Sequence, residues 1–154
     1  MSYIPERFKP YELVDKATYE KYGLASWRFI SERLTRSLDG LSFVLEKHFN
    51  RRIRLVCNNW HWYDEPNAPD YFQWRGLRTN KYPNYNEGSR HSYIPCIAAD
   101  LDSPELSARA LIDFVLEHQD EEWAKYIGGI EIGVNWLHID CRPRINGKIV
   151  TFRQ

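Results

Sequence analysis

The sequence has few cysteines, no long apolar run and no excess of charge of either sign. Its three cysteines, Cys57, Cys96 and Cys141, form no CxxC pair. This argues against a disulfide scaffold or a thiolate zinc ribbon and favours buried free thiols in a reducing compartment. No run approaches the ~20 apolar residues that cross a bilayer. Lys+Arg and Asp+Glu both number 21, so the basic footprint expected of a nucleic-acid-binding protein is missing.

No secretory leader is expected at the N-terminus either. The first ten residues, MSYIPERFKP, contain two prolines and no apolar segment. We therefore expect an extended arm over residues 1–10 and no signal peptide. Synthesis in the cytoplasm follows, and any target outside it would have to be reached by another route.

Aromatic residues, in contrast, are abundant. They make up 15% of the 154 residues, and 43% of the chain is hydrophobic. This is enough for a packed core, and the length predicts a single domain over residues 1–154. Many aromatics fall within 58–89, a segment rich in Asn, Pro and Gly. Loops of that length in compact domains are typically functional, and their aromatic side chains can line a binding cleft.

Hydrophobic spacing predicts helices mainly in the first half of the chain. Apolar residues at three- and four-residue steps predict a long helix over 32–49, weakened in its middle by Gly40. A short helical turn is expected over 18–22, ended by Gly23, and another after Ser26 as N-cap. A further helix is predicted from Ser103, as N-cap, to about His118.

Short β-strands are predicted mainly in the second half. Their expected ranges are 54–57, 98–101, 128–134, 136–141 and 149–152, the last of which follows the Asn146–Gly147 turn. We therefore expect an α+β fold in which a small antiparallel sheet is flanked by helices.

Three side chains far apart in the sequence have the chemistry of one metal site. Asp100 lies on a predicted buried strand, where an ionised carboxylate is costly unless it is paired or bound to a metal. His138 and Asp140 are two apart on another strand, so both emerge on one face. His91, Asp100 and His138 together supply two imidazoles and one carboxylate. Such a set leaves a fourth position open on the metal, as a catalytic zinc site requires. We predict a Zn²⁺ site formed by His91, Asp100 and His138.

The order of short motifs around these residues resembles a known family. Ser89-x-His91, then Ala98-Ala99-Asp100, then Trp136-Leu-His-Ile-Asp140 is similar to the M15 metallopeptidases. These are D-alanyl-D-alanine carboxypeptidases and endolysins that share their fold with the hedgehog signalling domain. The similarity to small phage-encoded members extends over about residues 11–142 and includes Arg75-Gly-Leu-Arg78.

The resemblance implies a zinc-dependent peptidase that cleaves peptidoglycan stem peptides or cross-links. His91, Asp100 and His138 match the family's ligands, and Arg78 matches an arginine that contacts the substrate and can pair with a peptide carboxylate. Ser89 and Trp60 are further candidates for substrate contact. The implied setting is a bacterium, including a phage-infected one, with action at the cell wall or as part of a virion.

The general base departs from the family pattern. Many members carry a glutamate three residues before the last histidine ligand, where this chain has Asn135. Two other carboxylates are candidates for the base. Asp140 shares a strand face with His138, and Glu131 precedes it on the neighbouring predicted strand.

Three alternatives remain open on the sequence alone. Asp102 could replace Asp100 as the ligand, because both would face the same way on a strand. The segment between His91 and Asp100 is two residues longer than the family's usual one, which would reshape the rim of the cleft. The chain could also be a non-catalytic module stabilised by the metal, such as a phage particle component, a hydrolase of a different amide, or an α+β domain without a metal.

Overall fold

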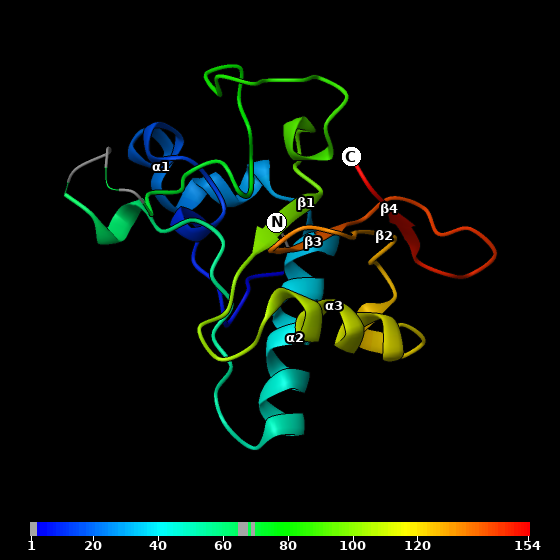
Figure 1. Cartoon of the computed structure of the whole chain (residues 1–154). Coiled ribbons are helices and arrows are strands. Elements are labelled where there is room, and N and C mark those ends of the chain that lie inside the picture. The colour runs from blue at the N-terminus through cyan, green and yellow to red at the C-terminus, as the bar shows by residue number, and fades with distance from the viewer. Residues whose placement is uncertain (1–2, 65–67, 69) are drawn as a thin grey trace.

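The computed structural model describes residues 3–64, 68 and 70–154 and has the expected α+β composition (Figure 1). Its helices are α1 (Lys16–Tyr22), α2 (Glu32–Phe49) and α3 (Ala108–Glu117). Its strands are β1 (Ala98–Leu101), β2 (Gly129–Glu131), β3 (Leu137–Asp140) and β4 (Val150–Phe152). In the described part of the chain, no helix combines the length and apolarity needed to cross a membrane.

Helix α2 covers the predicted range and forms much of the core. Its leucines at positions 34, 38, 41 and 45 are fully buried, as their spacing predicts. Asn50 ends the helix in the left-handed conformation, with φ of 52°. Gly40 does not interrupt the helix. A Cβ at that position would lie 2.9 Å from the Cβ of Trp123, so the glycine permits close packing against the segment Glu122–Ala124.

The sheet is mixed, whereas the sequence predicted an antiparallel one. Its strand order is β1-β3-β2-β4; β3 pairs antiparallel with β1 and β2, and β4 runs parallel to β2. The Asn146–Gly147 turn forms as expected, with positive φ at both residues, but it closes only on Ile145 and Lys148 within the connection. Arg144 ties this connection to the carbonyl of Ile127. The chain therefore crosses to the outer edge of β2 and does not form a hairpin with β3.

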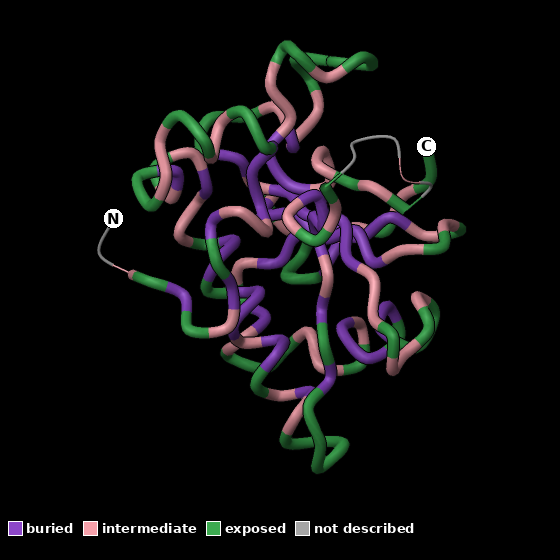
Figure 2. The backbone as a smooth tube through the Cα atoms, turned by 90° about the vertical axis from the view of Figure 1, so that its left-hand side faces the viewer, coloured by how far each residue is buried: buried purple, intermediate pink, exposed green. Residues whose placement is uncertain are grey.

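The two faces of the sheet have opposite character. On one face, Leu101, Ile130, Leu137 and Ile139 are fully buried and belong to the hydrophobic core that also includes residues of α2 and α3. Figure 1 shows these two helices beneath the strands, and Figure 2 shows the buried backbone concentrated at this junction. Because side chains alternate along a strand, the polar residues of β1, β2 and β3 project together from the other face.

Several predicted elements differ from the structure, including the strand expected over 128–134, which is shortened to β2. Helix α3 begins at Ala108, because Ser107 accepts the Ala110 N–H as its N-cap. Ser103 instead accepts the N–H groups of Glu105 and Leu106 in a separate turn. The strand expected over 54–57 is reduced to a single antiparallel bridge between Val56 and Asp102. Ser26 is a buried residue inside the 3₁₀ helix Gly23–Phe29, so it does not act as an N-cap.

Two buried side chains anchor the segments that surround the sheet. Asp39, on α2, accepts hydrogen bonds from the Tyr3 hydroxyl and from the N–H groups of Glu6 and Arg7, which fixes the described part of the N-terminal arm. Asn58 donates to the Val14 carbonyl and accepts from the Arg75 N–H. It thereby ties the residues just before α1 to Arg75, at the start of the segment 75–78.

Candidate metal centre

His91, Asp100 and His138 converge on the polar face of the sheet. Asp100 and His138 are direct cross-strand partners on β1 and β3, and His91 approaches from the short 3₁₀ helix Arg90–Ser92. All three are buried, and one potential ligand atom from each lies within 4.8 Å of the other two. Asp100 Oδ1 is 2.8 Å from His138 Nδ1 and 3.4 Å from His91 Nε2. Ligands of a tetrahedral zinc ion lie about 3.3 Å apart, so this donor set fits such a metal.

The backbone of residues 75–78 fixes His91. The His91 Nδ1 atom is 2.8 Å from the Gly76 carbonyl oxygen, so Nδ1 donates its proton to that oxygen and Nε2 is the atom that faces Asp100. The Arg78 N–H donates to the His91 carbonyl. Gly76 also packs against the backbone of Leu13, where a Cβ would overlap the carbonyl group. The glycine therefore permits the approach that orients the ligand.

His138 lies between two carboxylates. Its Nδ1 faces Asp100 Oδ1 at 2.8 Å, and its Nε2 faces Asp140 Oδ2 at 2.9 Å. Carboxylates only accept hydrogen bonds when ionised, so both ring nitrogens donate and the metal-free ring is an imidazolium. Burial alone would lower the pKa of His138, but the hydrogen bonds to Asp100 and Asp140 raise it to about 9.

The carboxylates of the centre stay ionised. Burial would raise the pKa of Asp100, but the neighbouring His91 and His138 hold it well below its usual range. The same competition keeps the pKa of Asp140 low, through hydrogen bonds from His138 and Arg142. A metal that replaces the Nδ1 proton of His138 would therefore find the Asp100 carboxylate already ionised beside it.

Glu131 extends the same cross-strand row. It is the partner of His138 on β2 and is buried, and no described residue forms a hydrogen bond or ion pair with its carboxylate. Its charge interacts with those of His91, Asp100 and His138, and burial raises its pKa above the usual value. A carboxylate of raised pKa beside a candidate metal centre is a candidate for accepting and donating a proton there.

Asp140 is placed differently from Glu131. It is fully buried behind His138 and accepts hydrogen bonds from the Arg142 backbone N–H, Nε and Nη2 at 2.6–3.1 Å. Both of its oxygens are engaged. This geometry favours a role in holding His138 over a role in proton transfer.

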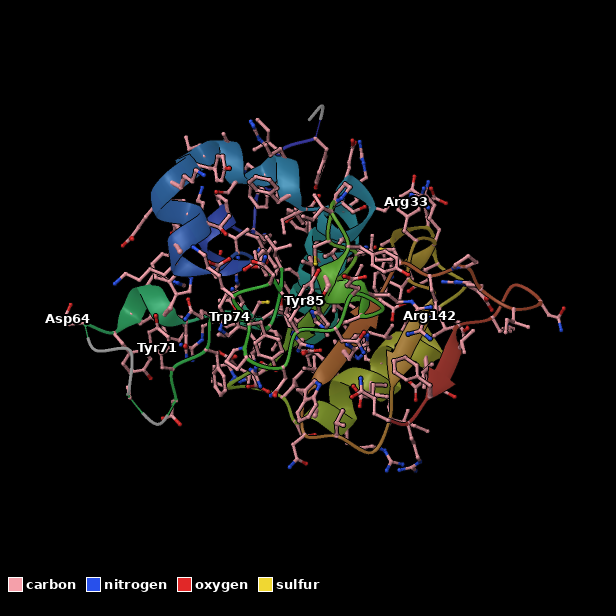
Figure 3. The ribbon with its side chains drawn as sticks, turned by 90° about the horizontal axis from the view of Figure 1, so that it is seen from above. Arg33, Asp64, Tyr71, Trp74, Tyr85 and Arg142 are labelled. Atoms are coloured by element: carbon pink, nitrogen blue, oxygen red, sulfur yellow. The ribbon has the colours of Figure 1, made fainter. Side chains whose placement is uncertain are left out.

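Arg78 joins the cluster to an aromatic cavity. Its Nη2 donates to Asp100 Oδ2 at 3.0 Å, and its Nε donates to the Trp74 carbonyl at 2.8 Å. A cavity of about 500 Å³ opens beside Asp100 and Arg78, with walls that include Tyr71, Trp74, Tyr82 and Trp136. Figure 3 shows Trp74 to the left of the strands and Arg142 over their right-hand part. A substrate in this cavity would lie against the ligand carboxylate and an arginine.

Two proposed substrate residues have internal roles. The Ser89 hydroxyl accepts the His91 N–H at 3.3 Å and caps the 3₁₀ helix that carries this ligand. Trp60 is buried, and its Nε1 donates to the Val14 carbonyl. Neither is among the described residues that line the cavity beside Asp100.

The structure also shows where the other residues considered for the metal site lie. Asp102 pairs with Arg75, and its side chain is 43% exposed, so it lies outside the cluster. Asn135 lines a separate cavity of about 760 Å³ next to α3 and outside the ligand group. All three cysteines are buried free thiols, and Cys96 donates to the Ala98 carbonyl.

No family model, curated protein or solved structure matches this chain. The geometry of its own residues therefore carries the functional argument.

Sequence reasoning missed the residues that orient the ligands. Gly76 acts through its carbonyl, Gly129 through its missing side chain, and Arg142 through Asp140. The motif around Arg78 drew attention to the first segment, but nothing in the sequence indicates that a backbone oxygen there faces His91. Gly129 lies beside Asp140 only after β2 and β3 have paired, and nothing in the sequence indicates that Arg142, just after β3, bonds back to the Asp140 carboxylate.

Proposed function

We propose that this chain is a zinc-dependent peptidase that acts on peptidoglycan stem peptides or cross-links. The observation that carries the proposal is the convergence of His91 Nε2, Asp100 Oδ1 and His138 Nδ1, each with a separate partner that orients it. The resemblance of the surrounding motifs to the M15 family, with its hedgehog-like fold, supports the choice of metal and substrate. The cell wall, or a virion that reaches it, is the proposed place of action.

The remaining residues have distinct roles in this proposal. A bound divalent metal would polarise a peptide carbonyl and lower the pKa of water. Glu131 accepts a proton from the attacking water and returns it to the leaving amine, because its carboxylate is buried, unpaired and of raised pKa. Arg78 orients the peptide through a carboxylate or carbonyl group, while Trp74 and Tyr82 form the wall of the cavity.

Hydrolysis of purified peptidoglycan tests the proposal. We expect release of peptides or D-alanine that stops with a chelator and is lost in His91→Ala. His118→Ala is the matched control, because His118 lies at the end of α3 and pairs with Glu121. Glu131→Gln should bind the metal but lose about 10²–10⁴-fold in rate. Unchanged rates in the presence of a chelator would exclude the peptidase.

A non-catalytic, metal-stabilised module is the second candidate. The observation that favours it is Asn135, which stands where the family pattern has a glutamate and lies outside the ligand group. This module would bind zinc and melt at a higher temperature with it, and it would show no chelator-sensitive hydrolysis. Activity that falls in Glu131→Gln distinguishes the peptidase from it.

A further inference from the structure

A fully buried carboxylate lies behind His138, on the side away from Asp100. Asp140 Oδ2 is 2.9 Å from His138 Nε2 and 2.6 Å from Arg142 Nη2. Oδ1 accepts from the Arg142 Nε at 2.8 Å and from its backbone N–H at 3.1 Å, and Arg90 Nε lies 3.9 Å away. These donors surround Asp140, so its carboxylate is fixed in position and closed to any substrate.

The neighbouring strand leaves room for this arrangement. Gly129, on β2, is the cross-strand partner of Asp140. A Cβ at position 129 would lie 2.5 and 2.8 Å from the two carboxylate oxygens and would overlap Arg142 Nε. Phe152, on β4, supports the same group, with its ring centroid 4.1 Å from the guanidinium carbon of Arg142. A larger residue than glycine at 129 would displace the carboxylate from the ring of His138.

We propose that Arg142 and Asp140, in the space left by Gly129, form a positioning relay that presents His138 Nδ1 to the metal. A neutral imidazole has one donor and one acceptor nitrogen, so a proton held on Nε2 by Asp140 leaves Nδ1 as the ligand atom. The relay rests on the metal centre of the proposed function, but it does not depend on the substrate. Asp140 is therefore a positioning residue, and the base is Glu131.

Zinc affinity in competition with a chelator tests the relay. Asp140→Asn keeps the size of the side chain but puts an N–H₂ group where donors converge. Arg142→Gln removes the guanidinium from a residue at the edge of the centre. Each should bind zinc about 10- to 100-fold more weakly than the unaltered chain. Asp113→Asn is the matched control, because Asp113 is exposed on α3 and pairs with Arg109; the zinc affinity of this variant should not change.

Nuclear magnetic resonance of the zinc-loaded protein detects the imidazole N–H protons directly. A general loss of stability would not change which of these protons is hydrogen-bonded. The relay predicts a hydrogen-bonded Nε2 proton on His138, which is lost or strongly shifted in Asp140→Asn. The Nδ1 proton of His91, held by the Gly76 carbonyl, serves as the internal control and should stay in place.

The outcomes separate the relay from the metal centre. If the unaltered chain binds no zinc, the metal centre fails and the relay fails with it. If it binds zinc and both folded variants bind with the same affinity, the relay is overturned while the metal centre stands. Should Asp140→Asn not fold, Arg142→Gln decides: weaker zinc binding supports the relay, and unchanged binding overturns it.

Discussion

At the scale of single residues, His138 is the side chain on which most of the site's contacts meet. It bridges Asp100 and Asp140, its ring centroid is 5.2 Å from that of His91, and it packs edge-on against Phe152. In the metal-free protein it carries two protons. A metal can bind Nδ1 only after displacing one of them, so metal binding and protonation compete at the same atom.

This competition sets the pH dependence of metal binding. The pKa of His138 is raised to about 9, so the stabilisation from its charged form is complete below about pH 6.5 and is lost as the pH rises through 9. We expect zinc binding at pH 7 to release about one proton, and affinity to rise up to tenfold per pH unit from pH 6.5 to 8. Calorimetric titration in buffers of different ionisation enthalpy measures the proton. Binding that is independent of pH and releases no proton would contradict this account of His138.

At the scale of elements, strand alternation explains why the site could be predicted in part. In β1 and β3, apolar residues alternate with Asp100, His138 and Asp140, and this pattern indicated a polar face before any coordinates. The leucine spacing of α2 was equally informative. The parallel pairing of β4 was not predictable, because β4 pairs with β2, which lies on the far side of β3 in the sequence, and no local pattern marks that partner. The start of α3 was also hard to predict, because Ser103 and Ser107 are both possible N-caps. In the structure, Ser107 caps the helix by accepting the Ala110 N–H, and Ser103 accepts the Glu105 N–H in a separate turn.

The segment 75–78 connects the long segment 58–89 to the candidate metal centre. Within it, Gly76 packs against the backbone of Leu13 and holds His91 through its carbonyl. Gly76→Ala should lower the free energy of unfolding of the metal-free protein by about 1–3 kcal/mol, because the new methyl group overlaps the Leu13 carbonyl. It should also weaken zinc binding, because the carbonyl that orients His91 is displaced.

Chemical denaturation and chelator competition measure the two effects. Gly88→Ala is the control: it is exposed, and its Cβ would lie 3.3 Å from the Asn86 side-chain oxygen. Equal stability and zinc affinity in both variants would mean that Gly76 does not position His91.

At the scale of the whole molecule, the sequence identified the three candidate ligands but not the residues that orient them. His91, Asp100 and His138 were identified by residue type and motif order, and the fold places all three on one face of the sheet. The choice between Asp100 and Asp102 needed the fold, since both suit a strand and only the first remains close to the histidines. Substrate contact by Ser89 and Trp60 stays a prediction, and the structure shows that both residues hydrogen-bond within the protein.

The central claim is that these three distant side chains bind one metal ion. Zinc titration of the purified chain, read by metal analysis after removal of free zinc, tests it most directly. We predict one zinc per chain, lost in His91→Ala and His138→Ala and retained in His118→Ala. A folded chain that retains no zinc, or a His91→Ala variant that retains as much as the unaltered protein, would contradict it.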